Sequence, residues 1–238
     1  MRKLVIEAAA GSEIGNRYRA NFDVVHLGRE PLLAVVADGM GDGEGSARAG
    51  RTAVDTFVES VRAAGVIDAD VLRGAVALAQ QRVGAIGRQV RGLAGCTLTA
   101  LVESTTGFWI AQIGDSRVYR LRDGLLELMT VDHTMAWLGA VHGWYPFHSP
   151  EAGAARYQLT RYVGHGAQPE PDVLSVTVRA GDRYLVCSDG VAEQVVYQEI
   201  LEILGRKESA ERMVRRLLDA AEAAGGNDNA TAVVVRAD

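Results

Sequence analysis

Short runs of apolar, largely β-branched residues separated by turn-forming residues dominate the chain and predict strands. We expect strands at residues 4–9, 32–37, 97–103, 108–113, 117–121, 125–129, 174–178, 183–187 and 232–235. Glycine-containing connections at 104–107 and 122–124 are short enough to be tight turns between neighbouring strands. Strands joined this closely must run antiparallel.

Helical periodicity is confined to separate groups of residues and does not alternate with the strands. Apolar residues recur at helical spacing in 47–61 and 72–86, and again in 210–221. Ser209 is the expected N-cap of the last helix, and the glycine pair at 225–226 is its stop. This pattern predicts an α+β fold of antiparallel sheets covered by helix pairs, and it disfavours a doubly wound parallel sheet.

The composition is even along the chain and indicates one domain, residues 1–238, with a sizeable core. Hydrophobic residues make up 48% of the sequence and only five residues are proline. The segment 135–171 differs, because it is rich in Gly, Pro, His and aromatic residues and has no clear period. We expect it to form a short helix and a surface flap. Cys96 and Cys187 lie in apolar runs, which favours buried free thiols over a disulfide.

Charge and hydropathy exclude several classes of protein. The net charge is −5 and the basic residues are interspersed with acidic ones, which disfavours a nucleic-acid surface. Glu7 interrupts the first apolar run too early for an export signal. No apolar run approaches the roughly 18 residues that a membrane-spanning helix needs. We therefore expect a soluble, cytoplasmic monomer with no nucleic-acid or membrane partner.

Aspartates at the ends of strand-like runs are the candidate functional residues. Asp38, Asp115, Asp189 and Asp228 each lie in a short polar motif next to an apolar stretch. Carboxylates at strand ends can converge on one edge of a sheet, where their mutual repulsion calls for a divalent cation. Since no histidine or cysteine belongs to these motifs, the oxygen ligands favour Mg²⁺ or Mn²⁺ over zinc.

Each motif taken singly has a plainer interpretation. The Gly-rich segment 38–43 is equally well explained as a strand-to-helix turn, and the Asp115 motif as a tight hairpin. Ser188 and Asp189 could cap a helix, and Asn227-Asp228-Asn229 has the composition of a loop. An EF-hand calcium loop is excluded, because Met40 and Ala49 stand where oxygen ligands are needed. The order and spacing of the four motifs together favour the metal site.

That ordered series resembles the metal-dependent protein phosphatases, also called protein phosphatase type 2C, and especially their compact bacterial branch. The similarity extends over essentially the whole chain and rests on Asp-Gly-Met-Gly (38–41), Gly-Cys-Thr-Leu-Thr-Ala (95–100), Ile-Gly-Asp-Ser-Arg-Val-Tyr (113–119), Asp-His-Thr (132–134), Leu-Val-Cys-Ser-Asp-Gly-Val (185–191) and Asn-Asp-Asn-Ala-Thr-Ala-Val-Val-Val (227–235). The fold implied by the resemblance is a four-layer αββα sandwich, in which helix pairs flank two antiparallel sheets.

The resemblance also implies the metal ligands. Asp38 would bridge two ions, and the carbonyl of Gly39 would bind the second of them. Asp189 and Asp228 would complete the first site, while Asp115 with Asp189 would hold a third, weaker ion. Asp23, Asn229 and Asp42 are expected beside the ligands rather than on the ions.

The segment from Arg17 to Asp23 departs from the family pattern. Tyr18 stands where the family has its phosphate-binding arginine, and Arg17 and Arg19 flank it. Either arginine could bind phosphate through its planar guanidinium group. Phe22 replaces an acidic residue that would help to hold water on the second ion. The histidines His133, His142, His148 and His165 are expected to be structural.

The function implied is a Mg²⁺- or Mn²⁺-dependent phosphatase that hydrolyses phosphoserine and phosphothreonine in proteins by direct attack of a metal-bridged water or hydroxide. The expected partners are a bacterial serine/threonine kinase or the proteins that it phosphorylates. One alternative is a catalytically weak phosphoprotein-binding module of the same fold, suggested by Phe22 and the displaced arginine. A calcium-binding structural domain is a more distant alternative, because it leaves the Asp189 and Asp228 motifs without a role.

Overall fold

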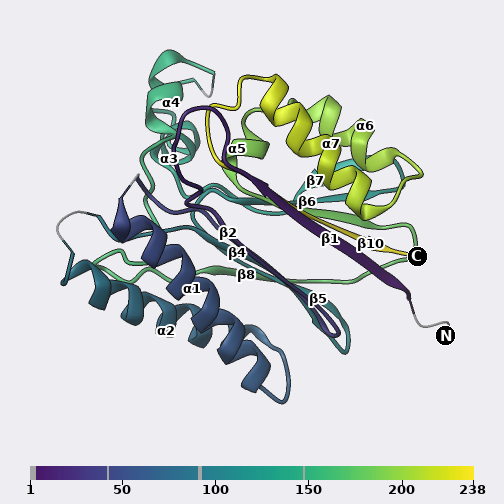
Figure 1. Ribbon diagram of the computed structural model, residues 1–238, viewed down its shortest axis with the longest axis horizontal. Helices are drawn as coiled ribbons and strands as arrows, with labels where there is room; N and C mark the ends of the chain where they lie inside the picture. The colour runs from purple at the N-terminus through teal and green to yellow at the C-terminus, as the bar shows by residue number, and fades with distance from the viewer. Residues whose placement is uncertain (1–3, 42, 91–92, 147) are drawn as a thin grey trace.

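Two five-stranded antiparallel sheets stack face to face, and helices cover the outer side of each (Figure 1). The computed structural model describes residues 4–41, 43–90, 93–146 and 148–238. One sheet has the order β1-β10-β9-β6-β7 and the other β2-β3-β4-β5-β8. The strands are β1 (Ile6–Glu13), β2 (Val24–Arg29), β3 (Leu32–Ala37), β4 (Leu98–Ser104), β5 (Gly107–Ile113), β6 (Arg117–Arg122), β7 (Leu125–Leu128), β8 (Asp172–Val176), β9 (Arg183–Cys187) and β10 (Ala230–Ala237). The helices are α1 (Glu44–Ala63), α2 (Ala69–Gly87), α3 (Met135–Val141), α4 (Pro150–Ala155), α5 (Asp189–Ala192), α6 (Tyr197–Gly205) and α7 (Ala210–Ala223).

Three apolar cores hold the layers together. The first, which includes Phe57 and Leu98, lies between the helices α1 and α2 and the β2-to-β8 sheet. The second, which includes Met213 and Leu185, lies between the helices α5 to α7 and the other sheet. The third lies between the sheets, where the rings of Phe108 and Tyr184 meet edge to face 5.3 Å apart. The predicted αββα sandwich is therefore confirmed.

The first and last strands of the chain are neighbours. β1 pairs with β10 along its whole length, from Ile6 opposite Ala237 to Glu13 opposite Ala230. Val5 and Asp238 extend the ladder with two backbone hydrogen bonds of 2.9 Å. Figure 1 accordingly shows the two ends of the chain close together. β10 thus joins the start of the chain to the centre of its sheet.

Local sequence signals explain several boundaries. The side chain of Ser209 caps α7 by accepting a hydrogen bond from the Arg212 N–H, as predicted. The strand β2 was not predicted, because Gly28 and His26 interrupt its apolar pattern. The helix α6 was also missed, since nine residues are too few to distinguish a buried helix from a strand by periodicity.

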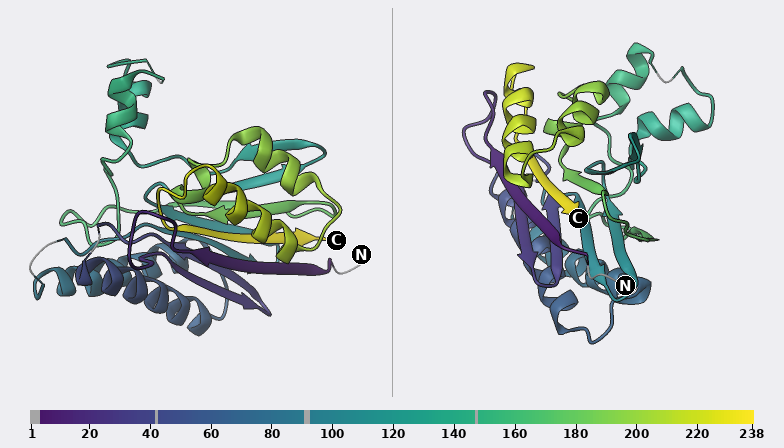
Figure 2. Two further views of the ribbon diagram at one scale, coloured as in Figure 1. Left: turned by 45° about the horizontal axis from the view of Figure 1, so that its top comes forward. Right: turned by 90° about the vertical axis from the view of Figure 1, so that its right-hand side faces the viewer.

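The segment between β7 and β8 leaves the sandwich and carries α3 and α4, which project from one end of it (Figure 2). Two short helices are present where one was predicted. Backbone contacts anchor the base of this projection, with Thr134 bridging to Leu159 and Cys96 to Val163. Cys96 also bridges to Gly39, so the base of the flap lies beside the end of β3.

The remaining predictions about the chain's environment concern cysteines and membranes. Cys96 and Cys187 are both buried and unpaired, as expected from their apolar neighbours. Among the helices that the structure describes, none combines the length and the apolar character needed to cross a bilayer.

Candidate active site

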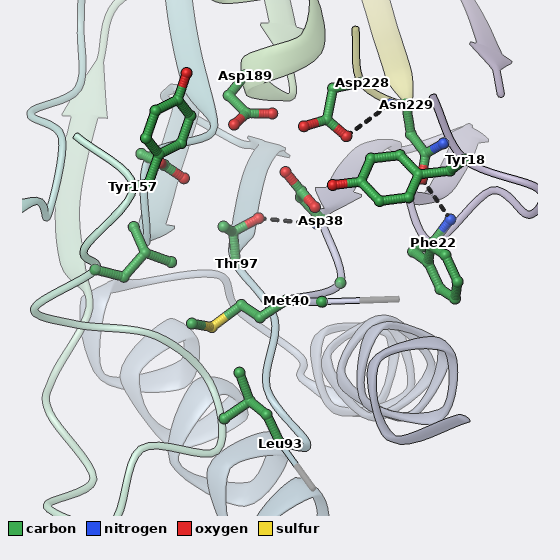
Figure 3. A pocket seen from close by; sticks show the side chains of 14 residues that line it. Tyr18, Phe22, Asp38, Met40, Leu93, Thr97, Tyr157, Asp189, Asp228 and Asn229 are labelled. Atoms are coloured by element: carbon green, nitrogen blue, oxygen red, sulfur yellow. Dashed lines mark hydrogen bonds between the residues drawn. The ribbon is translucent and has the colours of Figure 1, made fainter. Parts of the chain in front are cut away.

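A cavity of about 280 Å³ opens where β3, β5, β9 and β10 end or begin. All four strand-end aspartates line it: Asp38, Asp115, Asp189 and Asp228. Figure 3 shows the labelled three, Asp38, Asp189 and Asp228, with their carboxylates directed toward one another. Since liquid water occupies about 30 Å³ per molecule, the cavity has room for a phosphate group and several waters.

Asp38 is held at the end of β3 by the neighbouring strand. Its N–H donates to Thr97 Oγ1 at 2.9 Å, and the Thr97 N–H donates to the Asp38 carbonyl at 2.8 Å. The Thr97 hydroxyl in turn lies 2.8 Å from the Ser116 hydroxyl, in the loop that carries Asp115. These buried hydroxyls couple the positions of two of the four aspartates.

Asp189 begins α5 directly after β9, and tight packing fixes it against the start of β10. A side chain at Gly190 would come within 2.0 Å of the Asn229 carbonyl oxygen, so only glycine allows this approach. Ser188 ties the same strands together, since its Oγ accepts from the Thr231 N–H at 3.0 Å and donates to Asp23 at 2.7 Å. Asp23 is therefore a buried anchor beside the site and does not line the cavity.

Asn229 organises the loop before β2. Its side-chain oxygen accepts from the Phe22 N–H at 2.8 Å, and its amide nitrogen donates to the carbonyls of Ile14 and Ala20. Asp228 beside it accepts a hydrogen bond from the Asn229 N–H at 2.8 Å. One dipeptide thus supplies a carboxylate to the cavity and holds the loop that forms the opposite wall.

The loop from Asn16 to Phe22 places Tyr18, and neither flanking arginine, in the cavity wall. The phenol oxygen of Tyr18 points toward the aspartates (Figure 3). The Arg17 guanidinium lies over the Tyr18 ring, 5.2 Å from its centroid. Burial raises the pKa of Asp228, and the charge of Arg17 offsets part of that rise. Arg19 is exposed and makes no such contact with a described residue. Phe22 lines the cavity as well.

The aspartates repel one another. Burial, followed by the charges of Asp189, Asp23 and Asp115, raises the pKa of Asp38 well above its usual value. Burial and then the charge of Asp228 raise the pKa of Asp189 to about 6. No ion pair between described residues includes any of the four cavity aspartates. The site is therefore short of positive charge.

The donor set fits hard divalent cations. Asp189 Oδ1 is buried and has no hydrogen-bond partner among the described residues, so a carboxylate that lines a negative cavity keeps an unsatisfied acceptor. Gly39 lines the same cavity through its backbone alone. Across the described part of the chain, no three His, Cys, Asp or Glu side chains form a complete ligand group for one ion. Backbone carbonyls and water would thus have to complete each coordination shell, which is usual for Mg²⁺ and Mn²⁺.

The histidines are placed as predicted for structural residues, outside the cavity lining. His133 is buried, accepts the Gly114 N–H on Nδ1 at 3.1 Å, and contacts Asp172 through Nε2 at 3.1 Å. Burial lowers its pKa, so the neutral ring holds the loop that carries Asp115. Asp42 lies outside the described residues.

Sequence reasoning missed several cavity residues, three of which carry a hydroxyl group. Thr97 lies in a quoted motif, Gly-Cys-Thr-Leu-Thr-Ala, and its hydroxyl could have been recognised as a ligand-orienting group. Tyr18 was noted only as an absent arginine. Tyr157 comes from the base of the flap and is 72% exposed, and no local pattern placed it at the cavity.

Comparisons with known proteins agree on one protein family. Residues 20–232 match the family model described as Protein phosphatase 2C. The chain is 35% identical over 237 residues to the serine/threonine protein phosphatase PstP of Mycobacterium tuberculosis. That alignment covers 97% of this chain but only 45% of the relative, so the chain spans about half the length of that protein.

Solved structures agree with the sequence matches. The catalytic domain of PstP in complex with two manganese ions superposes with a TM-score of 0.87 at 31% identity, covering 99% of both chains. The phosphatase MsPP of Mycobacterium smegmatis, solved with cacodylate, superposes with a TM-score of 0.84 at 34% identity, covering 96% of this chain and 97% of that one.

Proposed function

The chain belongs to the protein phosphatase 2C family, and we propose that it removes phosphate from phosphoserine and phosphothreonine in proteins. The observation that carries this proposal is the convergence in one open cavity of four aspartates, each without an ion pair to a described residue. The relative PstP is a serine/threonine protein phosphatase, and its catalytic domain binds two manganese ions in a solved structure.

Asp38, Gly39, Asp189 and Asp228 would hold two Mn²⁺ or Mg²⁺ ions, and Asp115 with Asp189 a third. When bound, such ions neutralise the phosphate charge and make water in the cavity more acidic, and therefore more nucleophilic at neutral pH. The chain's own task would be to position the carboxylates, and the contacts of Thr97, Ser188 and Gly190 at the strand ends support this role.

The loop before β2 would bind the phosphate. Tyr18 presents a phenol O–H at the cavity wall, and Arg17 adds positive charge directly behind it. The neutral Tyr18 hydroxyl, even with the Arg17 guanidinium behind it, would hold a phosphate oxygen less strongly than an arginine that binds the phosphate through two hydrogen bonds. We therefore expect the chain to bind the phosphate group of its substrate more weakly than relatives that have such an arginine, and still to catalyse the hydrolysis.

The cellular setting is part of the proposal. We propose that the protein acts as a monomer in the cytoplasm on a bacterial serine/threonine kinase or on the proteins that such a kinase phosphorylates. The bacterial origin of its phosphatase relatives supports this setting, and so do its two buried free thiols, which suit a reducing compartment.

Phosphate release from a phosphothreonine peptide and from a chromogenic phosphate ester, measured across a Mn²⁺ titration, tests the proposal. We expect Mn²⁺-dependent release by the wild type, and a loss of at least about 100-fold in Asp38→Ala and Asp189→Ala, as for other groups that organise the reacting charge. Asp123→Ala, in an exposed turn, is the matched control. If the wild type released no more phosphate than Asp38→Ala at saturating Mn²⁺, the chain would instead be a phosphoprotein-binding module.

A further inference from the structure

A second hollow lies between α1 and α2, on the sandwich face away from α6 and α7, and we call it the helix groove. It has a volume of about 680 Å³. Its lining includes Arg48, Arg51 and Arg82, together with the apolar side chains of Ala47, Ala85 and Ile86. None of the described residues that line it carries a carboxylate, in contrast to the aspartate-rich cavity.

The helix groove is continuous with the catalytic cavity. An intermediate hollow shares Arg48 and Gln89 with the helix groove, and shares Met40, Gly41 and Leu93 with the cavity. Figure 3 shows Met40 and Leu93 on the side of the cavity that faces the two helices. These shared residues place three adjoining hollows in a row from the aspartates, past Glu44 at the start of α1, to the three arginines, and we call this row the furrow.

The arginines of the helix groove are available to an incoming anion. Arg51 is exposed and makes no ion pair or side-chain hydrogen bond with any described residue. Arg48 and Arg82 pair with Glu44 and Glu59 at 3.2 Å, but all four side chains are at least 42% exposed. Exposed pairs of this kind contribute little to stability, so a ligand carboxylate can replace the internal one at little cost.

We propose that the helix groove binds acidic side chains of the substrate protein, at some distance in sequence from the phosphorylated residue. The proposal rests on the proposed phosphatase function, because it assigns the cavity end of the furrow to the phosphorylated residue. Charge complementarity selects the occupant: three arginines over an apolar surface, on a protein of net charge −5, favour an acidic polypeptide segment.

Chain geometry sets the spacing. The eight residues from Glu44 to Arg51 span about 10 Å of helix, at a rise of about 1.5 Å per residue. An extended peptide covers that length in about three residues, in addition to those that fill the intermediate hollow. Acidic residues about four to seven positions from the phosphorylated residue would therefore reach Arg48 and Arg51.

The test compares phosphothreonine peptides that differ only at those positions. One peptide carries aspartates four to seven residues on the N-terminal side, a second carries them on the C-terminal side, and a third carries serines on both sides. We expect one acidic peptide to be hydrolysed with a kcat/KM about fivefold above that of the serine peptide at low salt, through a lower KM. The ratio of kcat/KM values for two peptides is taken within one variant. Any effect of the substitution on the cavity changes both values equally and therefore cancels.

Arg51→Glu should abolish that preference, and Arg51→Lys should keep most of it, since the lysine retains the charge. Arg73→Glu, on the exposed side of α2 and outside the helix groove, should keep the wild-type preference. Equal rates for all three peptides in the wild type, or a preference that survives in Arg51→Glu, would overturn the proposal.

Failure of the proposed function is distinguishable from failure of this inference. If no peptide were hydrolysed, fluorescence anisotropy of the labelled, unphosphorylated acidic peptide would still report on the helix groove. Tighter binding to the wild type than to Arg51→Glu, weakened by added salt, would support the groove, and equal binding to both would overturn it.

Discussion

At the scale of one residue, the features that suit Asp38 to bind a cation also make the metal-free fold less stable. Its carboxylate is surrounded by other aspartates, and both burial and their charges raise its pKa. Keeping this carboxylate ionised at neutral pH therefore costs the folded chain free energy, and a bound cation would offset that cost.

The substitution Asp38→Asn should accordingly have opposite effects on stability and on activity. Without metal, we expect the variant to be more stable than the wild type by about 1 kcal/mol, because one of several repelling charges has gone. Its thermal stabilisation by saturating Mn²⁺ should be smaller than that of the wild type, which is about 2.7 kcal/mol at 100 times the dissociation constant. Thermal melts with EDTA and with Mn²⁺ measure both effects. A metal-free variant less stable than the wild type would contradict the repulsion argument.

Substitutions of Arg17 and Arg19 should also differ in their effects on KM. Arg17 lies over Tyr18 and acts on Asp228, whereas Arg19 makes no comparable contact with a described residue. Arg17→Ala should raise KM for a phosphothreonine peptide about fivefold, as expected for one partly exposed charge-assisted contact. Arg19→Ala should change KM less than about twofold. Steady-state kinetics on the two variants decide this, and equal effects would remove Arg17 from the phosphate site.

At the scale of elements, the site depends on the junction between α5 and β10. Gly190 lets the first turn of α5 approach the Asn229 carbonyl, and this contact fixes Asp189 relative to Asp228. The two carboxylates belong to different elements, so any shift of the helix changes the distance between them.

Gly190→Ala should therefore impair both folding and catalysis. The added methyl group would meet a backbone oxygen that cannot rotate away, so we expect a loss of about 2–3 kcal/mol in the free energy of unfolding. Phosphatase activity should fall more than about tenfold even where the variant is fully folded, because displaced ligands misplace the reacting groups. Gly74→Ala, on an open face of α2, is the control and should be neutral or stabilising. A folded, fully active Gly190→Ala would show that the junction tolerates a shift.

The cavity and the helix groove show which features could be predicted from the sequence and which could not. The aspartates were identified because each lies beside an apolar run within a short motif, and the helices α1, α2 and α7 because of the spacing of their apolar residues. Tyr18 could not be placed, because its loop is held by Asn229, more than 200 residues away in the chain. The helix groove was also invisible in the sequence, since its arginines look like ordinary solvent-facing residues of two amphipathic helices.

At the scale of the whole molecule, a buried ion pair at the end of the sandwich away from the cavity joins three strands. Asp182, just before β9, accepts hydrogen bonds of 2.7 and 2.6 Å from Arg122 of β6, and its side chain is 1% exposed. The Arg179 N–H donates to the same carboxylate, and the Asp182 carbonyl accepts from the Ala237 N–H of β10. Burial alone would raise the pKa of Asp182, but these hydrogen bonds hold it below the usual value.

Asp182→Asn should destabilise the protein in a pH-dependent way. At pH 7 we expect a loss of about 3 kcal/mol, because Arg122 keeps its charge without a counterion. The folded-state pKa lies below the unfolded one, so the ionised carboxylate stabilises the fold above about pH 4 and loses this effect as the pH falls through the folded value. Urea unfolding at pH 7 and at pH 3 should therefore show a smaller difference at pH 3. Asp123→Asn, in the exposed β6–β7 turn, is the control, and a pH-independent loss would exclude the pair as its source.

The pairing of β1 with β10 has a consequence for the order of events during translation. The two strands are separated by about 220 residues, which a ribosome adds in roughly 10–45 s at about 5–20 residues per second. Throughout that interval β1 lacks its pairing partner, and Asp228, which immediately precedes β10, has not been made. The nascent chain thus carries Asp38, Asp115 and Asp189 before the fourth aspartate of the cavity exists, and the cavity can be completed only after β10 has left the exit tunnel.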